Sequence, residues 1–289
     1  MTAARACLGT AGAICLGILV ALAGSDGVGR VFGVPVFALC IAAAFVVQWV
    51  AFIPAYLFST ERFFDLVGSA TFLLAGCLAL VFAETLDVRA IAIAILVGIW
   101  ALRLGAFLGL RVHGTGGDRR FDTIKPHFAV FLMTWTLQAV WMSLAFGPGL
   151  AAITSGTRIP VDGFLVAGTA LWLAGFAIEV VADEQKRRFR RRPENATRFI
   201  DSGLWAWARH PNYFGEILLW VGIAVAAFPT LAGWQHVTLI SPVFVWLLLT
   251  RISGVRMLDA SGRKRWGNDE AYTRYRANTP MLIPRPPCR

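Results

Sequence analysis

The sequence predicts an all-α integral membrane protein with about eight transmembrane helices. Of its 289 residues, 57% are hydrophobic and only 15% are charged, and the mean hydropathy is +0.64. Apolar stretches of roughly 20 residues, the length that a helix needs to cross a bilayer, recur along the whole chain. The basic residues gather between alternate stretches, which is typical of a multi-span protein.

Eight apolar stretches define the expected spans. They cover residues 7–24, 33–58, 66–83, 90–110, 128–149, 162–182, 213–228 and 233–250. The seventh is short and ends at Pro229, so it predicts either a tilted span or a re-entrant half-helix. The first lacks a convincing cleavage site and is followed by further spans, so we interpret it as a span and not as a signal peptide.

The distribution of Lys and Arg predicts the orientation. With eight spans, 23 of the 27 Lys and Arg residues fall on one side and three fall on the other, namely Arg30, Arg89 and Arg158. Arg103 lies within the fourth span. Because basic loops stay in the cytoplasm, both termini and every charged cluster are expected to be cytoplasmic.

The composition also excludes several partners. A net charge of +10 would suggest nucleic acid in a soluble protein, but here the basic residues lie between apolar spans. Membrane lipid headgroups and a phosphorylated cofactor are therefore the expected counter-charges, and no nucleic acid is expected. The five cysteines lie mostly in apolar runs without a C-x-x-C pair, so neither disulfides nor a metal site is expected.

A polar stripe begins inside the sixth span. On a continuous helix Glu179, Asp183, Arg187 and Arg190 share one face at spacings of three and four. Carboxylates there could hold hydroxyl or amide donors while arginines clamp phosphates. An ordinary helix end with snorkelling arginines is the alternative. It explains the neighbouring arginines better than it explains Glu179 and Asp183.

The segment R-H-P-N-Y-F-G-E, residues 209–216, is the most specific motif. Its proline suits the first turn of a helix, which then presents Asn212 and Glu216 on one face with Tyr213 beside them. Gly215 permits close approach of another helix or a ligand. Helix packing alone does not explain Glu216 a full turn inside a span, since intramembrane carboxylates usually mark a functional site.

Isolated polar residues occur in other spans. Arg103 should reach the cytoplasmic half or pair with a carboxylate. Asp65 opens the third span, where function and simple helix capping are equally good explanations. Gln48 and Gln138 indicate hydrogen bonds between helices.

These motifs resemble the steroid 5-alpha-reductase family, and most closely its bacterial branch often labelled DUF1295. The resemblance rests on R-H-P-N-Y-F-G-E, on the D-x6-R spacing from Asp183 to Arg190, and on the closing pattern of Tyr272, Tyr275, Pro280 and Pro284. It is most specific over 160–285 and weaker over 60–145. It divides the chain into an N-terminal transmembrane hairpin, 1–58, and a reductase-like membrane domain, 59–289.

The resemblance implies a seven-helix-type reductase core in a bacterial inner membrane. Such an enzyme, similar to a 3-oxo-5-alpha-steroid 4-dehydrogenase, binds NADPH in a cytoplasm-facing cavity. It passes hydride to a carbon–carbon double bond of an apolar lipid or steroid-like enone. The implied cofactor residues are Glu179, Asp183, Arg187, Arg190, Arg209, His210, Asn212, Glu216 and Tyr272. Asp65 is the implied acid beside the substrate carbonyl, with Arg103 or Tyr213 as alternates.

Three positions depart from the family pattern. The tyrosine that polarises the carbonyl aligns near Trp100, an asparagine of the cofactor helix aligns with Glu179, and a histidine after the last span aligns near Val255. NADPH binding is therefore better supported than a steroid as substrate.

Two other classes remain open. Isoprenylcysteine carboxyl methyltransferases also carry R-H-P-x-Y and a Y-x-x-Y tail, but bind S-adenosylmethionine. Asn212 followed by F-G-E favours the reductase. A non-catalytic lipid-binding membrane protein would not need Glu179, Asp183 and Glu216 together.

Overall fold

The computed structural model describes residues 2–115, 117 and 121–287, and leaves the side chains of 110–115 undescribed. The basic loop of 111–127 therefore lies partly outside the described residues, including Arg111, Arg119 and Arg120. The chain divides into two compact units. Unit 1 comprises residues 1–166 and 224–241, and unit 2 comprises residues 167–223 and 242–289.

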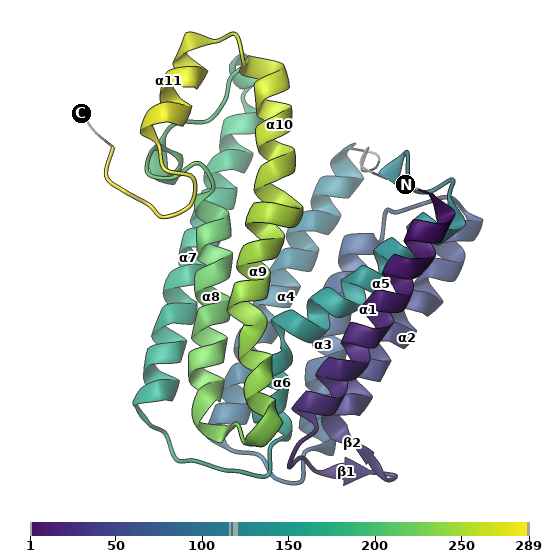
Figure 1. The fold of residues 1–289 in the computed structure, drawn as a ribbon. Helices are drawn as coiled ribbons and strands as arrows, with labels where there is room; N and C mark the ends of the chain where they lie inside the picture. The colour runs from purple at the N-terminus through teal and green to yellow at the C-terminus, as the bar shows by residue number, and fades with distance from the viewer. Residues whose placement is uncertain (1, 116, 118–120, 288–289) are drawn as a thin grey trace. The chain divides into compact units, whose positions relative to one another are not determined.

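Unit 1 is built mainly from α-helices. Its elements are α1 (Ala3–Gly24), β1 (Arg30–Val31), β2 (Val34–Pro35), α2 (Val36–Leu57), α3 (Phe64–Phe82), α4 (Val88–Thr115), α5 (Phe128–Ala145), α6 (Gly147–Thr154), η4 (Phe228–Thr230) and η5 (Gly233–Ile240). Helix α1 packs along α5, while α2 packs along both α3 and α5 (Figure 1). The N-terminal hairpin of 1–58 thus contributes two helices to unit 1.

Unit 2 contains most of α7 (Gly163–Arg191) and α8 (Pro211–Ala227), together with the C-terminal elements. These are η2 (Pro193–Asn195), η3 (Gly203–Ala206), α9 (Ser241–Leu247), the π-helical turn η6 (Leu248–Ile252), α10 (Gly254–Trp266) and α11 (Glu270–Asn278). Figure 1 shows α7, α8 and the α9–α10 rod running side by side in this unit.

The structure confirms the predicted all-α class and span count. Eight helices of the described part are long and apolar enough to cross a membrane. The seventh, Pro211–Thr230, has 20 residues, so the segment that seemed short is long enough for a span. The last extends from Gly233 to Trp266, further than the sequence predicted, because the π-helical turn joins α9 to the charged helix α10.

The predicted fifth span is interrupted. Helix α5 ends at Ala145, and the wholly buried helix α6 begins beyond Phe146, with Pro148 in its first turn. Proline removes a backbone donor, so a helix commonly breaks at that point. The Ser241 hydroxyl donates to the Ala145 carbonyl at 2.6 Å. The break is therefore compensated inside the protein, as membrane burial demands.

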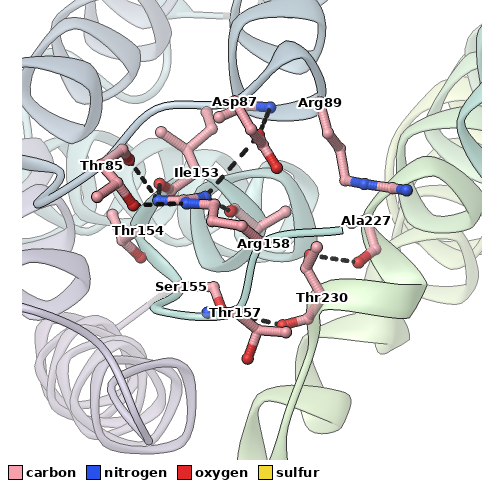
Figure 2. A network of polar contacts seen from close by, with 12 residues as sticks. Thr85, Asp87, Arg89, Ile153, Thr154, Ser155, Thr157, Arg158, Ala227 and Thr230 are labelled. Carbon is pink, nitrogen blue, oxygen red and sulfur yellow. Dashed lines mark hydrogen bonds and ion pairs between the residues drawn. The ribbon is translucent and has the colours of Figure 1, made fainter. Parts of the chain in front are cut away.

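The three arginines of the less basic side gather at one end of unit 1. Arg158 donates to the carbonyls of Thr85, Ala152 and Ile153 and lies 3.9 Å from Asp87 (Figure 2). The segment before it is joined to the Arg30 hairpin by a bridge between Val28 and Ser155. This clustering agrees with the charge segregation that the sequence predicts.

Arg89 is the buried arginine of this end. Its side chain is 1% exposed, pairs with Asp162 at 2.8 Å, and donates to the Ala226 carbonyl. The Leu165 backbone N–H and the Arg89 guanidinium hold the pKa of Asp162 below its ordinary value, so the carboxylate stays ionised. Arg89 thus ties the start of α4 to the segment before α7 and to the end of α8.

We expect Arg89→Met to lower the free energy of unfolding by about 3–5 kcal/mol, because it leaves Asp162 and the Ala226 carbonyl without their shared donor. Arg30→Met is the matched control, since Arg30 is exposed and donates to the nearby Gly33 carbonyl; its effect should stay within about 0.5 kcal/mol. Denaturant unfolding in detergent measures both. Equal losses would contradict this role for Arg89.

Candidate functional site

Two pairs of glycines bring α7 and α8 together in unit 2. A Cβ atom on Gly215 would lie 2.5 Å from the Gly175 carbonyl oxygen, and one on Gly222 would lie 2.6 Å from the Gly168 carbonyl oxygen. The two helices therefore run antiparallel in backbone contact. The sequence predicted a close approach at Gly215, and the structure places helix α7 there.

The contact aligns the polar faces of the two helices. Gly215 lies against the backbone of Glu179, which is 3% exposed. One turn away, the Asn212 amide donates to the Asp183 carboxylate at 3.2 Å. Glu216 follows Asn212 by one turn. The four polar residues that the sequence assigned to one site thus lie at one end of the α7–α8 contact.

The loop after α7 folds back onto the same end. The Trp205 indole donates to the Ala182 carbonyl at 3.0 Å, and Lys186 lies over the Trp205 ring at 4.7 Å. The Gln185 side chain accepts from the Leu204 N–H at 2.9 Å. The small buried core of Ala182, Ile200 and Trp205 therefore fixes the loop that leads to the R-H-P motif.

The C-terminal tail packs over this loop. Tyr275 donates to the Trp205 carbonyl at 2.7 Å, and burial raises its pKa, so the phenol stays protonated. The Tyr272 ring meets the Phe199 ring edge to face, with ring centroids 5.1 Å apart. Asp269 caps α11 by accepting from the Ala271 N–H at 2.8 Å.

Asp259 of α10 joins the tail to the R-H-P motif. Its carboxylate lies 3.3 Å from the Arg209 guanidinium, 3.1 Å from that of Arg276, and 3.6 Å from the His210 ring. The Nε atoms of Arg209 and Arg276 are buried without a partner among the described residues. One carboxylate thus holds two guanidinium groups that keep unused donors, an arrangement that suits an additional anion.

Sequence reasoning missed Asp259 and Arg276. Asp259 is the only acidic residue between 251 and 268, in a strongly basic segment, and this was the available signal. Its partner Arg209 lies 50 positions away, so only the tertiary fold reveals the contact.

His210 lies under Tyr213, with ring centroids 5.5 Å apart and nearly parallel planes. Its ring is 5% exposed, and neither nitrogen has a hydrogen-bond partner in the described part of the chain. Burial lowers the pKa of His210, and this outweighs the opposing effect of Asp259. Lys186 and Arg209 lower it further, so the ring is neutral at pH 7.

The two predicted phosphate clamps on α7 differ. The Arg187 guanidinium makes two hydrogen bonds to Glu184, at 2.6 and 2.7 Å, and Arg188 shares that carboxylate. Arg190 lies 5.5 Å over the Trp266 ring and donates to the Arg198 carbonyl. Arg190 is therefore directed to the tail, whereas Arg187 is already neutralised by a carboxylate.

The predicted catalytic acid lies in unit 1. Asp65 is in the first turn of α3, and Gly105 of α4 packs against Ser69 one turn further along. Arg103 therefore belongs to the end of α4 that meets the start of α3. Trp100, at the position of the missing phenol, is fully buried against Phe72 with ring centroids 5.1 Å apart. Tyr213, the other alternate, belongs to unit 2.

Comparison with known proteins places the chain near sterol-modifying reductases. A family model described as "Protein of unknown function (DUF1295)" matches residues 51–279. The 3-oxo-5-alpha-steroid 4-dehydrogenase 1 of Bos taurus is 34% identical over 73 residues, which is 25% of this chain and 28% of the relative. The Delta(14)-sterol reductase of Methylotuvimicrobium alcaliphilum is 32% identical over 176 residues, which is 55% of this chain and 39% of the relative.

The human 3-oxo-5-alpha-steroid 4-dehydrogenase 1 is 35% identical over 65 residues, covering 22% of this chain and 25% of the relative. The chain therefore aligns with less than half the length of each of these relatives. No solved structure matches.

We expect Gly215→Ala to destabilise the protein by about 1–3 kcal/mol, because the new methyl group would overlap the α7 backbone. Gly163→Ala is the matched control, since a Cβ atom there meets nothing within 4 Å. Unfolding of both variants in detergent measures the difference. A Gly215→Ala protein as stable as the control would show that α7 and α8 are not in backbone contact.

His210 should also make the stability of the protein depend on pH. Its folded-state pKa lies below the ordinary value of 6.5, so the unfolded chain binds the proton more tightly. Stability is therefore fully present above about pH 6.5 and declines as the pH falls below it. His210→Asn should remove this decline. The exposed His236→Asn variant should retain it, and the same decline in both variants would contradict the assignment.

Proposed function

The chain belongs to the DUF1295 family, and we propose that it is an integral membrane reductase that uses NADPH. Its substrate would be a carbon–carbon double bond in an apolar lipid or steroid-like enone. The names of the reductase relatives support the reaction class. By the distribution of Lys and Arg, we place the termini and the cofactor site on the cytoplasmic side of a bacterial inner membrane.

The observation that carries the proposal is that unit 2 contains two different sets of polar groups. Carboxylates and an amide gather at the end of the α7–α8 contact, while Arg209 and Arg276 share one carboxylate and keep buried Nε donors. A dinucleotide offers hydroxyl and amide groups to the first set and phosphates to the second. The donor set therefore fits NADPH.

Each residue has a distinct proposed role. Asp183 and Asn212, already bonded to each other, would bind ribose hydroxyls or the nicotinamide amide, with Glu179 and Glu216 beside them. Arg190 and Arg209 would bind phosphates. Arg187 would contribute less, because Glu184 already holds it through two nitrogens. His210 and Tyr272 would line the site through their rings.

Reduction of an enone needs a hydride, a proton and an acid beside the carbonyl oxygen. When bound, NADPH supplies the hydride for the β-carbon of the enone. Asp65, if protonated, would donate a hydrogen bond to the carbonyl oxygen as enolate charge develops. Arg103 and Tyr213 are the alternates for this role.

The proposal is tested with purified protein, NADPH and a panel of enones, while the loss of cofactor absorbance is followed. Turnover of an apolar enone would support it. Tight binding of S-adenosylmethionine together with no binding of NADPH would favour the methyltransferase class instead. Binding of neither would favour a non-catalytic lipid-binding protein.

Substitutions should separate cofactor binding from turnover. Asn212→Ala and Arg190→Ala each remove a directed contact worth about 1.5–3 kcal/mol, so NADPH affinity should fall on the order of 10- to 100-fold. Arg192→Ala, at an exposed loop position, is the matched control and should change little. Asp65→Asn should keep NADPH affinity and lower turnover.

The same series can refute these roles. Equal small losses of NADPH affinity across the arginines of 187–192 would mean that these arginines only set the membrane topology. Loss of NADPH binding in Asp65→Asn with normal binding in Arg190→Ala would reverse the assignment of cofactor and catalytic residues.

A further inference from the structure

Helices α2, α3 and α5 of unit 1 meet around a pair of buried glutamines. Gln48 of α2 is fully buried and Gln138 of α5 is 8% exposed. Both lie well inside candidate spans, where bulk water does not reach. The side-chain oxygen of each has no hydrogen-bond partner among the described residues.

The orientation of the Gln48 amide follows from Thr71. The Thr71 hydroxyl has one proton, which it donates to the Val67 carbonyl at 2.7 Å. It can therefore only accept from the Gln48 amide nitrogen, which lies 2.8 Å away. The Gln48 oxygen consequently points away from Thr71, and exchanging the oxygen and nitrogen would break the bond.

Gln138 lies against the same face of α3. A Cβ atom on Gly68 would lie 2.3 Å from the Gln138 amide nitrogen, so the absence of a side chain at Gly68 admits the amide. Gly68 and Thr71 are three positions apart, and such residues are neighbours on one helix face. The two amides therefore lie within about one helical turn of each other.

The buried polar atoms at this junction that have no partner in the described part of the chain all require a hydrogen-bonding guest. A buried acceptor without a donor is costly, and among the described residues Gln48 and Gln138 each carry one such oxygen. The indole N–H of Trp135, one turn before Gln138 on α5, is also buried without a partner among the described residues. A guest that donates through O–H and accepts through oxygen matches these groups: an alcohol can donate to one glutamine oxygen, and a water molecule can donate to both.

We propose that this α2–α3–α5 junction binds a neutral O–H donor. The donor is either the hydroxyl group of an apolar alcohol or a trapped water molecule, which share this chemistry. The first source rests on the proposed function and makes the enzyme selective for hydroxylated lipids. A ketone offers only an acceptor, so it would leave both glutamine oxygens unpaired.

The junction also gives the N-terminal hairpin a role. Gln48 precedes the 51–279 segment that the family model matches. The hairpin would thus add a recognition group to unit 1 that the matched segment does not contain.

The first test asks whether Gln138→Met makes the protein less stable or more stable. If an O–H donor is bound, Gln138→Met removes a hydrogen bond and should lower the folding constant about 2- to 10-fold. If the oxygen is truly unpaired, removing it should raise the folding constant. Leu137→Met on the exposed side of α5 is the matched control and should change little. An unchanged or more stable Gln138→Met protein would overturn the proposal.

The second test identifies the donor with wild-type protein in detergent. Cholesterol is compared with its methyl ether, which has the same skeleton but no O–H. A higher unfolding midpoint with cholesterol alone, lost in Gln138→Met, would assign the site to a lipid hydroxyl. No shift with either compound, combined with a less stable Gln138→Met protein, would assign it to water.

Equal stabilisation by cholesterol and the ether that persists in Gln138→Met would overturn recognition of O–H at this junction. NADPH affinity is measured on the same samples and should be unchanged in Gln138→Met. Failure of wild-type protein to bind NADPH would contradict the proposed function without affecting the stability result.

Discussion

The backbone contact between α7 and α8 is the constraint on which the candidate cofactor site depends. Gly175 and Gly215 leave no room for even a methyl group, so the two helices can approach until their polar ends face each other. At this separation the Asn212 amide donates to the Asp183 carboxylate at 3.2 Å. Polar residues that are costly in a membrane are thus held in register by residues that carry no side chain at all.

Buried polar groups differ in what their partners join together. Arg89 has a carboxylate and a backbone carbonyl as partners, and it joins segments that are far apart in the sequence. The Nε atoms of Arg89, Arg209 and Arg276 and the side-chain oxygen of Gln138 are all buried without a partner among the described residues. A low-dielectric interior penalises such unpaired groups. The ion pair of Arg89 joins parts of the fold, whereas the unpaired donors of Arg209 and Arg276 are the ones that the proposed cofactor would use.

Much of the architecture is predictable because its causes are local. Span length follows from apolar runs, and the shared face of Asn212 and Glu216 follows from a spacing of four. The continuation of α9 into α10 was not predictable in this way. The charges after residue 250 suggested that the helix ends there, but it continues to Trp266. Asp259 was missed for the same reason, since its partner Arg209 lies 50 positions away.

Hydrogen–deuterium exchange of the purified protein, with and without NADPH, tests the central claim most directly. It reports where a ligand protects the backbone, independently of the substrate. If unit 2 holds the cofactor, NADPH should slow exchange in residues 179–190, 205–216 and 254–278 and leave 163–172 unchanged. Protection that is absent from these segments, or that appears there only with S-adenosylmethionine, would contradict the account.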